Sequence, residues 1–236
     1  MLLYFVRHGD PVYNPDSLTP LGLRQAEAVG RRLARYGLDQ IFSSPMIRAQ
    51  ETARPAAEML RKKISTVEFA SEDRAWQGLS ALDDQGRRRW ACDDPETRAL
   101  FTTPEVRALG MDWYDHPAFV GNTYKDYMHW MGGECDAFFA ALGYERQEWH
   151  GFYRAVRLNG ERIGLFAHGG FGGAFLSHVL GIPYPQLSRM INLSHSSLTV
   201  IEFADRERIC IPVLLTLSND AHLYHENLPL YDRAKF

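Results

Sequence analysis

The sequence has few cysteines, little net charge and no long apolar run, and each of these features excludes a class of protein. The three cysteines are far apart and form no CxxC pair, so neither a disulfide framework nor a zinc site is indicated. The formal net charge of -3 argues against non-specific binding to nucleic acid or to an anionic membrane. No apolar run approaches the length of a membrane span.

Other absences bear on location and on domain organisation. The first residues hold no basic stretch and only a short apolar run, so they lack the features of a secretory signal peptide. Together with the few cysteines, this predicts a cytoplasmic protein in a reducing compartment. We find no internal repeat, linker or low-complexity tract, so the chain, residues 1–236, is expected to form a single domain with a sizeable core.

Two hydrophobic runs end on histidine followed by glycine. Leu2–Val6 precedes Arg7-His8-Gly9, and Ile163–Ala167 precedes His168-Gly169-Gly170. Short runs that are rich in aliphatic and aromatic residues are typical of buried strands. Open α/β sheets form their ligand crevices at the carboxyl ends of strands, so the pattern predicts an α/β protein with both histidines in a site.

The other predicted elements follow from apolar patterns and helix-start signals. Thr19 and Pro20 should start a helix that ends near Gly37. Ser44-Pro45 should start another, with Arg48 in its first turn and a kink or new start at Pro55. The remaining predictions are a loop at 10–18, strands at 40–43, 64–70, 198–203 and 209–217, helices at 136–142 and 171–180, and a hairpin at 159–160 that joins 152–157 to the strand at 163–167.

The segment from about 72 to 133 differs from the rest of the chain. It holds four of the five tryptophans and has poor apolar periodicity. We expect an irregular, partly helical insertion that caps the carboxyl edge of the sheet. The alternative is that these tryptophans only fill a satellite core.

Arg7 and Arg48 suit an anionic substrate, because planar guanidinium groups bind phosphate in a bidentate manner. Arg48 near a helix start adds free backbone N–H groups to the same anion site. His8 can act as a nucleophile if its attacking nitrogen is unprotonated, and a backbone carbonyl can fix the other N–H. Gly9 lets the backbone approach a bound group closely. His168 can donate to a phosphate if it is protonated.

Taken singly, these residues also have structural explanations. A histidine can be a satisfied core residue, an arginine a solvated helix residue, and Asn14 can form an Asx-turn. Taken together they favour function, because one reaction uses all of them. His222 and His225 are three positions apart without a strong third ligand, so no metal site is predicted in the tail.

The ordered motifs resemble those of the histidine phosphatase superfamily, also called the phosphoglycerate mutase-like family. The matching segments are Arg7-His8-Gly9, Asn14, Leu18-Thr19, Gly22, Gln25-Ala26, Ser43-Ser44-Pro45, Arg48, Thr52-Ala53, Gly132-Gly133-Glu134 and His168-Gly169-Gly170. The resemblance implies a three-layer α/β/α sandwich with a mostly parallel sheet, to which the predicted insertion adds a cap. It also implies phosphohistidine formation on His8, with phosphate contacts from Arg7, Asn14, Arg48, His168 and Gly169.

The resemblance implies that the proton donor follows the third strand, where Glu72 and Asp73 are adjacent. We favour Glu72, because the family usually has Glu and because its longer side chain reaches farther. Either residue can instead be a solvated turn carboxylate, and Glu134 is the next candidate. Two positions depart from the family: Asp10 stands where Glu is common, and Cys135 where Ser is frequent. We expect both changes to affect the supporting shell of the pocket and the substrate class more than the chemistry.

The predicted function is a metal-independent phosphomonoester hydrolase that needs no cofactor and acts on a small phosphorylated metabolite. A phosphoglycerate-type mutase is the first alternative, but its characteristic stretch is not found in residues 74–84. A phospho-ligand binding module without catalysis is the second, although a binder need not keep a nucleophile. No nucleic-acid or membrane partner is expected. The sequence leaves open both the substrate and the oligomeric state, including whether the chain forms a homodimer.

Overall fold

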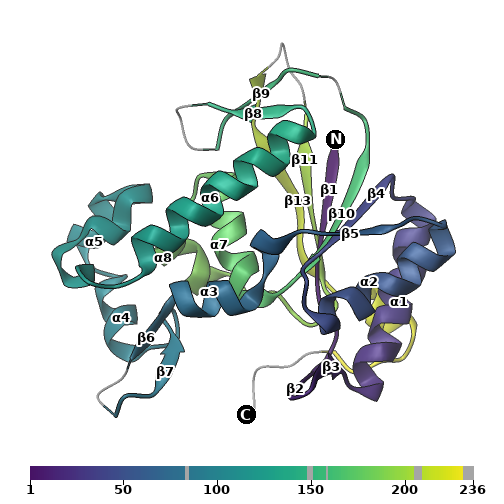
Figure 1. Cartoon of the computed structure of the whole chain (residues 1–236), viewed down its shortest axis with the longest axis horizontal. Helices are drawn as coiled ribbons and strands as arrows, with labels where there is room; N and C mark the ends of the chain where they lie inside the picture. Colours follow the sequence, from purple (N-terminus) through teal and green to yellow (C-terminus); the bar gives the residue numbers. More distant parts are fainter. Residues whose placement is uncertain (83–84, 148–150, 158, 205–208, 231–236) are drawn as a thin grey trace.

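A six-stranded sheet forms the centre of the protein (Figure 1). The computed structural model describes residues 1–82, 85–147, 151–157, 159–204 and 209–230. In spatial order, the strands of this sheet are β13 (Pro212–Asn219), β11 (Leu198–Phe203), β1 (Leu2–Arg7), β10 (Arg162–Ala167), β4 (Gln40–Ser43) and β5 (Ile64–Thr66). The four neighbouring strands β1, β10, β4 and β5 are parallel to one another, whereas β11 is antiparallel to both of its neighbours, β1 and β13. The prediction of a mostly parallel sheet is confirmed.

The other elements are short strands and helices, several of them 3-10 helices. They are, in chain order, β2 (Pro11–Tyr13), β3 (Asp16–Leu18), α1 (Pro20–Tyr36), α2 (Ile47–Leu60), η1 (Glu68–Ala70), α3 (Glu72–Gly78), β6 (Ser80–Leu82), β7 (Arg88–Trp90), α4 (Pro95–Leu100), α5 (Pro104–Ala108), η2 (Gly110–Asp115), η3 (Pro117–Phe119), α6 (Tyr124–Ala141), β8 (Tyr144–Arg146), β9 (Tyr153–Ala155), α7 (Gly169–Leu180), α8 (Tyr184–Met190), β12 (Ile209–Cys210) and α9 (Ala221–His225). Among the described helices, none is long and apolar enough to cross a membrane.

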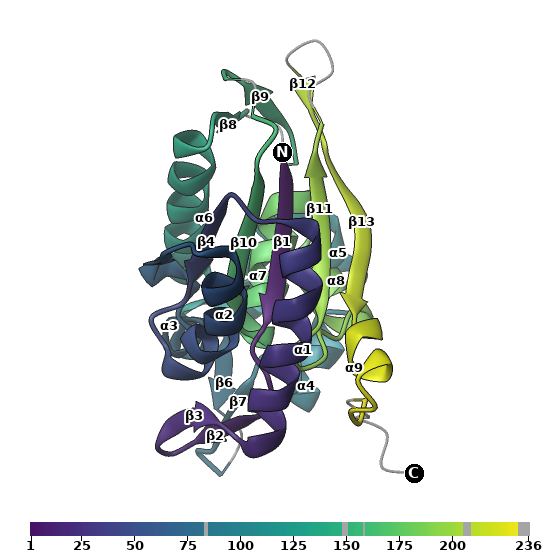
Figure 2. The same ribbon diagram turned by 90° about the vertical axis from the view of Figure 1, so that its right-hand side faces the viewer.

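Helices cover both faces of the sheet because its central strands are apolar on both. In β1, Tyr4 and Val6 pack into a cluster with side chains of α1 and α2. Leu3 and Phe5 point the other way, into the larger core that includes side chains of α6 and α7. Successive side chains of a strand alternate between the two faces, so β1 contributes to both cores. Figures 1 and 2 show α1 and α2 on one side of the sheet and α6 and α7 on the other, as in a three-layer sandwich.

Two of the predicted helices begin close to the expected residues. The Thr19 hydroxyl accepts a hydrogen bond from the Gly22 N–H at 3.0 Å, as an N-cap does. The prediction that Ser44-Pro45 starts α2 is wrong by two residues, since Met46 is the N-cap and makes no side-chain cap bond. α2 also runs through Pro55 as one helix and does not restart there.

Three predicted connections differ from the structure. Residues 10–18 are not a plain loop but contain the antiparallel hairpin β2–β3. The strand at 64–70 ends at Thr66, after which η1 buries Phe69 and Ala70. The hairpin at 159–160 is wrong: β9 pairs with β8 and β12 in a separate sheet. β10 lies between β1 and β4, so it has no free edge to offer β9.

The segment predicted to be a cap contains α3, the hairpin β6–β7 and several short helices. Much of its aromatic content is core, as Phe101 and Trp113 pack edge to face at 5.3 Å between ring centroids. α6 continues through Gly133, so the structure has no break at the predicted end of the cap. Gly132 lies inside α6, and a Cβ there would lie 2.8 Å from the ring of His178, so this glycine allows α7 to pack closely.

Candidate active site

The chain leaves β1 and β10 toward opposite faces of the sheet. β1 leads to α1 on one side, and β10 leads to α7 on the other (Figure 1). The two strands are parallel neighbours with Arg7 opposite Ala167, so the next residues, His8 and His168, lie side by side. Their ring centroids are 5.1 Å apart. Open α/β sheets bind ligands where neighbouring connections diverge in this way.

Arg48 reaches the same place from the start of α2. Its Nη1 donates to Asp16 Oδ1 at 2.6 Å, and the same carboxylate accepts from the Ile47 N–H at 2.7 Å. Thr52, one turn later, donates to the Arg48 carbonyl and accepts from the Gly9 N–H. These bonds fix the loop after β1 against the start of α2.

Gly9 is required by packing against α1. A Cβ at this position would lie 2.6 Å from the carbonyl oxygen of Gly22. The close approach that the sequence suggested for Gly9 is therefore made to a helix backbone. Asp10 follows at once and accepts from the Thr19 hydroxyl at 2.7 Å, so the first turn of α1 is tied to the end of β1.

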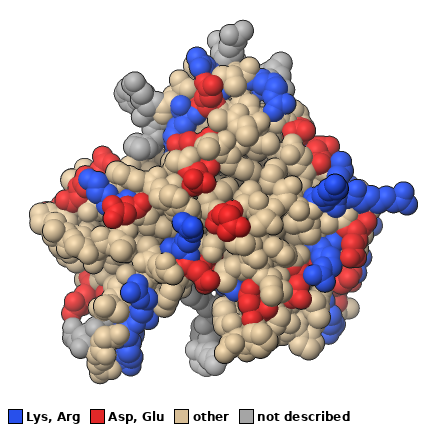
Figure 3. Space-filling view, in the orientation of Figure 1, with Lys and Arg blue, Asp and Glu red and all other residues tan. Residues whose placement is uncertain are grey.

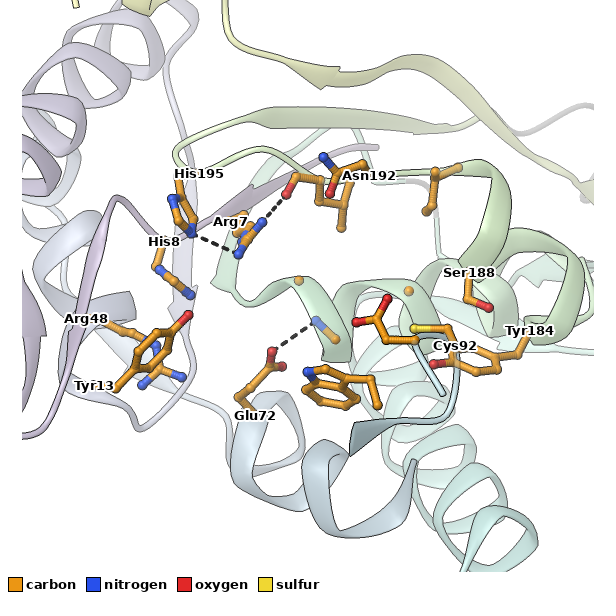
Figure 4. A pocket seen from close by; sticks show the side chains of 17 residues that line it. Arg7, His8, Tyr13, Arg48, Glu72, Cys92, Tyr184, Ser188, Asn192 and His195 are labelled. Carbon is orange, nitrogen blue, oxygen red and sulfur yellow. Dashed lines mark hydrogen bonds between the residues drawn. The ribbon is translucent and has the colours of Figure 1, made fainter. Parts of the chain in front are cut away.

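A cavity of about 280 Å³ opens at this edge of the sheet, lined by 17 residues (Figure 4). Of the residues predicted to bind or react, the lining contains Arg7, His8, Arg48, Glu72 and Gly169. In the space-filling view of Figure 3, the surface is notched at its lower edge, between the part that carries β6 and β7 and the part that carries β2 and β3.

His8 is held in one tautomer by its neighbour. Its Nδ1 lies 2.7 Å from the Gly9 carbonyl oxygen, which can only accept, so the proton is on Nδ1 and Nε2 has a free lone pair. Burial, and then the positive charges of Arg7 and Arg48, lower the pKa of His8 well below its ordinary value of 6.5. The ring is therefore neutral and its Nε2 nucleophilic at neutral pH.

His168 is fully buried beside His8 and is not part of the cavity lining. Its Nε2 lies 2.8 Å from Ser44 Oγ, whereas its Nδ1 has no hydrogen-bond partner in the part of the chain that the structure describes. Burial, and then His8 and the two arginines, lower the pKa of His168 well below 6.5. This imidazole is therefore neutral at neutral pH, so it can donate to an anion only from the nitrogen that carries its single proton.

Glu72 and Asp73 are separated by the structure. Glu72 lines the cavity, and its two carboxylate oxygens accept from the Gly170 N–H at 3.0 Å and the Phe171 N–H at 2.8 Å. Burial outweighs these hydrogen bonds and raises the pKa of Glu72 above its ordinary value of 4.5. Asp73 is exposed and lies outside the lining, and Glu134 is exposed on α6.

Asn14 is not brought to the cavity. It is exposed at the tip of the hairpin β2–β3 and does not line the pocket. Tyr13, its neighbour in β2, does line it and lies 5.4 Å from the Arg48 guanidinium, measured to the ring centroid. Cys135 likewise does not line the cavity and is buried in the main core.

His195 is a cavity residue that the sequence analysis did not identify. Its Nε2 accepts from Arg7 Nη2 at 2.9 Å, and its Nδ1 lies 3.5 Å from Asp10 Oδ1. The guanidinium of Arg7 also donates to the Leu193 carbonyl, and a Cβ at Gly169 would lie only 3.2 Å from it. Arg7 is thus fixed in position by groups on several sides. Burial, and then Arg7, lower the pKa of His195 to about 3.

The antiparallel strand β11 is what delivers His195. Leu198, the first residue of β11, pairs with Val6 near the end of β1, so the residues before β11 lie beside the loop that follows β1. The Ser196 N–H donates to the His8 carbonyl at 2.9 Å. Only the direction of β11 reveals this placement, and the sequence pattern does not give that direction.

Fold and cavity together define an α/β protein with two arginines, a neutral histidine and a half-buried carboxyl group in one site. In the part of the chain that the structure describes, no group of three or more His, Cys, Asp or Glu side chains is placed to hold a metal ion. The family model of the histidine phosphatase superfamily (branch 1) matches residues 3–110. The resemblance expected from the motifs is confirmed over this part of the chain.

Curated relatives match part of the chain. A 2,3-bisphosphoglycerate-dependent phosphoglycerate mutase of Methylobacterium radiotolerans is 40% identical over 124 residues, which cover 46% of this chain and 57% of the mutase. A fructose-2,6-bisphosphatase TIGAR of Xenopus tropicalis is 36% identical over 95 residues, which cover 36% of this chain and 34% of that protein. The matches therefore span about a third to somewhat over half of the length of these relatives.

Solved structures match almost the whole chain. A mycobacterial glucosyl-3-phosphoglycerate phosphatase complexed with VO3 has a TM-score of 0.59 at 19% identity, over 91% of this chain and 97% of the other. A phosphoserine phosphatase from Entamoeba histolytica, in complex with 3-phosphoglyceric acid, has a TM-score of 0.59 at 18% identity, over 94% and 98%. At these identities the likeness establishes the fold alone. The relatives named here are phosphatases and a mutase.

Proposed function

We propose that this protein is a phosphomonoester hydrolase that transfers the phosphoryl group first to His8 and then to water. The observation that carries the proposal is the state of the His8 ring. Its Nδ1–H is bound to the Gly9 carbonyl and its pKa is lowered, so Nε2 is an unprotonated nucleophile beside two arginines. A residue that only bound phosphate would serve better as a proton donor.

In the first step, His8 Nε2 forms a bond to phosphorus while the bond from phosphorus to the ester oxygen breaks. Arg7 and Arg48 stabilise the charge on the phosphoryl oxygens. Glu72 gives its proton to the leaving alcohol, for which its raised pKa suits it. We assign a further phosphoryl contact to His168 Nδ1, because Nε2 is already bonded to Ser44.

In the second step, water attacks the phosphohistidine. The Glu72 carboxylate takes a proton from the water while the oxygen of the water forms a bond to phosphorus, and the bond between phosphorus and His8 Nε2 breaks. His8 returns to its neutral state and Glu72 is protonated again. At the start of α7 the N–H groups of Gly170 and Phe171 bind Glu72, so we assign the anion contact in both steps to the Gly169 N–H.

Hydrolysis of an aryl phosphate tests this proposal most directly. Wild-type protein should turn over the aryl ester, and acid-quenched enzyme should carry a phosphate that is labile in acid and stable in base. His8→Ala should abolish both. Vanadate, which mimics the five-coordinate phosphoryl group, should inhibit, and activity should persist after treatment with EDTA. Substantial activity in His8→Ala would contradict the mechanism.

A mutase is the second candidate, because a curated relative is named a phosphoglycerate mutase. In a mutase, the same residues would transfer the phosphoryl group from His8 to a second hydroxyl group of the substrate and not to water. Incubation with 3-phosphoglycerate and a trace of 2,3-bisphosphoglycerate separates the two activities. A mutase produces 2-phosphoglycerate, and a hydrolase releases inorganic phosphate. For either activity we propose a small phosphorylated metabolite as substrate and the cytoplasm as location.

A further inference from the structure

Arg7 is oriented by a loop that lies between α8 and β11. We call residues 192–197 the Arg7 loop, because its Leu193 carbonyl and its His195 Nε2 both accept from the Arg7 guanidinium. Figure 4 shows His195 and Arg7 joined in this way at the edge of the cavity. An arginine side chain loses much rotational freedom when it is fixed, so the shape of the Arg7 loop decides where this guanidinium lies.

The backbone of the Arg7 loop is joined to the nucleophile at Ser196. The Ser196 N–H donates to the His8 carbonyl at 2.9 Å, and the φ angle of Ser196 is 61°, in the left-handed region. Residues other than glycine keep this backbone conformation only where the surrounding contacts hold them in it. The contacts of Ser196 therefore decide whether the loop keeps its shape beside His8.

The contacts of the Ser196 side chain come from α1 and from the C-terminal helix α9. The Ser196 hydroxyl donates to the Gln25 carbonyl at 3.1 Å and lies 2.9 Å from His222 Nε2. A hydroxyl group has one proton and a carbonyl can only accept, so His222 Nε2 is the donor to Ser196 Oγ. On the other side of the ring, Arg32 Nη1 donates to His222 Nδ1 at 3.4 Å. Both bonds require a neutral ring with its proton on Nε2.

The surroundings of His222 keep the ring in that state. Its side chain is buried, whereas the side chain of His225, three residues later, is 78% exposed. Burial, and then the charge of Arg32, lower the pKa of His222 to about 4, so the ring is neutral near neutral pH. Leu223 packs on Ala28 of α1 and so anchors α9 beside α1, as Figure 2 shows.

A second bond from the C-terminal segment reaches the same loop. Ser218, in β13, accepts from the Ser194 N–H at 2.8 Å through its hydroxyl oxygen. Ser218 is itself held in place, because its N–H donates to the Thr199 hydroxyl at 3.0 Å. The Arg7 loop is thus bound from the C-terminal side at two points, and His222 supplies the bond that reaches Ser196.

We propose that His222 is a positioning residue, which fixes the Arg7 loop through Ser196 and so places Arg7 and His8 for phosphoryl transfer. This inference rests on the hydrolase proposed above. The path runs from His222 Nε2 to the Ser196 hydroxyl, from the Ser196 N–H to the His8 carbonyl, and through the adjacent His195 to Arg7. His222 itself lies outside the cavity lining.

His222→Phe tests the proposal, because it keeps an aromatic ring in the same space and removes both hydrogen bonds. The loss of a hydrogen bond should lower kcat for an aryl phosphate, and weaken the affinity for vanadate, by roughly threefold to tenfold. KM should change less, since the position of Arg7 matters most when charge spreads over the phosphoryl group in the transition state. His222→Gln offers an N–H at about the same reach and should recover most of the loss.

His225→Phe is the matched control, because it makes the same substitution at the exposed histidine of α9. It should keep the wild-type kcat, KM and vanadate affinity. An equal loss in His222→Phe and His225→Phe would overturn the proposal. Wild-type kcat and vanadate affinity in folded His222→Phe would also overturn it.

Ser196→Ala tests whether His222 acts through this hydroxyl group, and it is the milder change if His222→Phe does not fold. It should lower kcat by a similar factor, and adding His222→Phe should cause little further loss. Wild-type kcat in Ser196→Ala, or fully additive losses in the double variant, would mean that the proposed path is wrong.

Counting active sites separates a loss of position from a loss of stability. The amount of phosphohistidine formed at saturation gives the number of folded sites, and kcat is then expressed per site. A lower midpoint of thermal unfolding with an unchanged kcat per site in His222→Phe would overturn the proposal. Absence of all turnover in the wild type would instead show that the hydrolase proposal fails. In that case calorimetric binding of vanadate to the same variants still measures the effect of His222, with the same outcomes.

Discussion

The His195→Ala substitution tests how strongly the position of Arg7 depends on its neighbour. His195 Nε2 accepts from Arg7 Nη2 at 2.9 Å, and the side chain is buried at 7% exposure. A hydrogen bond that involves a charged group contributes about 1.5–3 kcal/mol, and each 1.4 kcal/mol corresponds to a factor of ten. We therefore expect kcat/KM for an aryl phosphate to fall by roughly tenfold to a hundredfold.

His195→Gln is the variant that separates positioning from packing. The glutamine carbonyl oxygen extends about as far as the histidine Nε2 and can accept from Arg7. It should recover most of the activity and most of the affinity for vanadate that the alanine variant loses. Circular dichroism and the midpoint of thermal unfolding check that both variants are folded.

The pH dependence gives an independent readout. His195 has a pKa of about 3, so it is a neutral acceptor throughout the working range. Its loss should therefore lower kcat/KM by the same factor at every pH from about 5 to 8. A change in the shape of the profile would mean that His195 moves a proton. Wild-type kcat/KM and vanadate affinity in His195→Ala would refute the positioning role altogether.

Three further predictions concern the acid, the nucleophile and the tryptophans. Glu72→Gln should lower kcat by roughly 10²–10⁴-fold on alkyl phosphates, and should slow the phosphorylation step of aryl phosphates much less. Asp73→Asn should stay close to wild type on both substrates. The reverse pattern would assign the role of proton donor to Asp73. The proposed mechanism needs neutral His8 and protonated Glu72. Because the pKa of His8 is lowered, kcat/KM for alkyl phosphates should fall on the acid side only below pH 6.5. Because the pKa of Glu72 is raised, kcat/KM should fall on the alkaline side only above pH 4.5, and Glu72→Gln should remove this alkaline fall. Binding of phosphate should change the tryptophan fluorescence of the protein. Trp76→Phe should reduce that change, because Trp76 packs on Trp90, which lines the cavity. An unchanged fluorescence signal in this variant would exclude Trp76 as the reporter.

The features that the sequence predicted well are local ones. The runs before His8 and His168 are strands, and the Thr19 cap is formed as expected. Each depends on residues within about one turn or one strand length, so its signal is present in the sequence itself. The arginine, histidine and carboxyl types that phosphoryl chemistry requires were identified for the same reason, since they follow such elements directly.

Errors arose where the outcome depended on pairing between distant segments. The hairpin at Asn159-Gly160 had a sound turn signal, but β10 was already enclosed by β1 and β4. Asn14 and Tyr13 are neighbours in one hairpin, and only the packing of that hairpin decides that Tyr13 reaches the cavity. Glu72 and Asp73 were distinguished in the same way, by which of them faces the start of α7.

The sequence alone therefore determined the kinds of groups that end the strands and begin the helices. The tertiary structure decided which of these groups share a cavity, and it added residues from remote segments. His195 lies at the far end of the chain from Arg7, yet antiparallel pairing of β11 with β1 places the two side chains 2.9 Å apart. Burial then lowers the pKa of His8 and raises the pKa of Glu72, as the proposed mechanism requires. The physical reason is that desolvation and charge proximity are properties of three-dimensional packing, whereas capping and periodicity are properties of neighbouring residues.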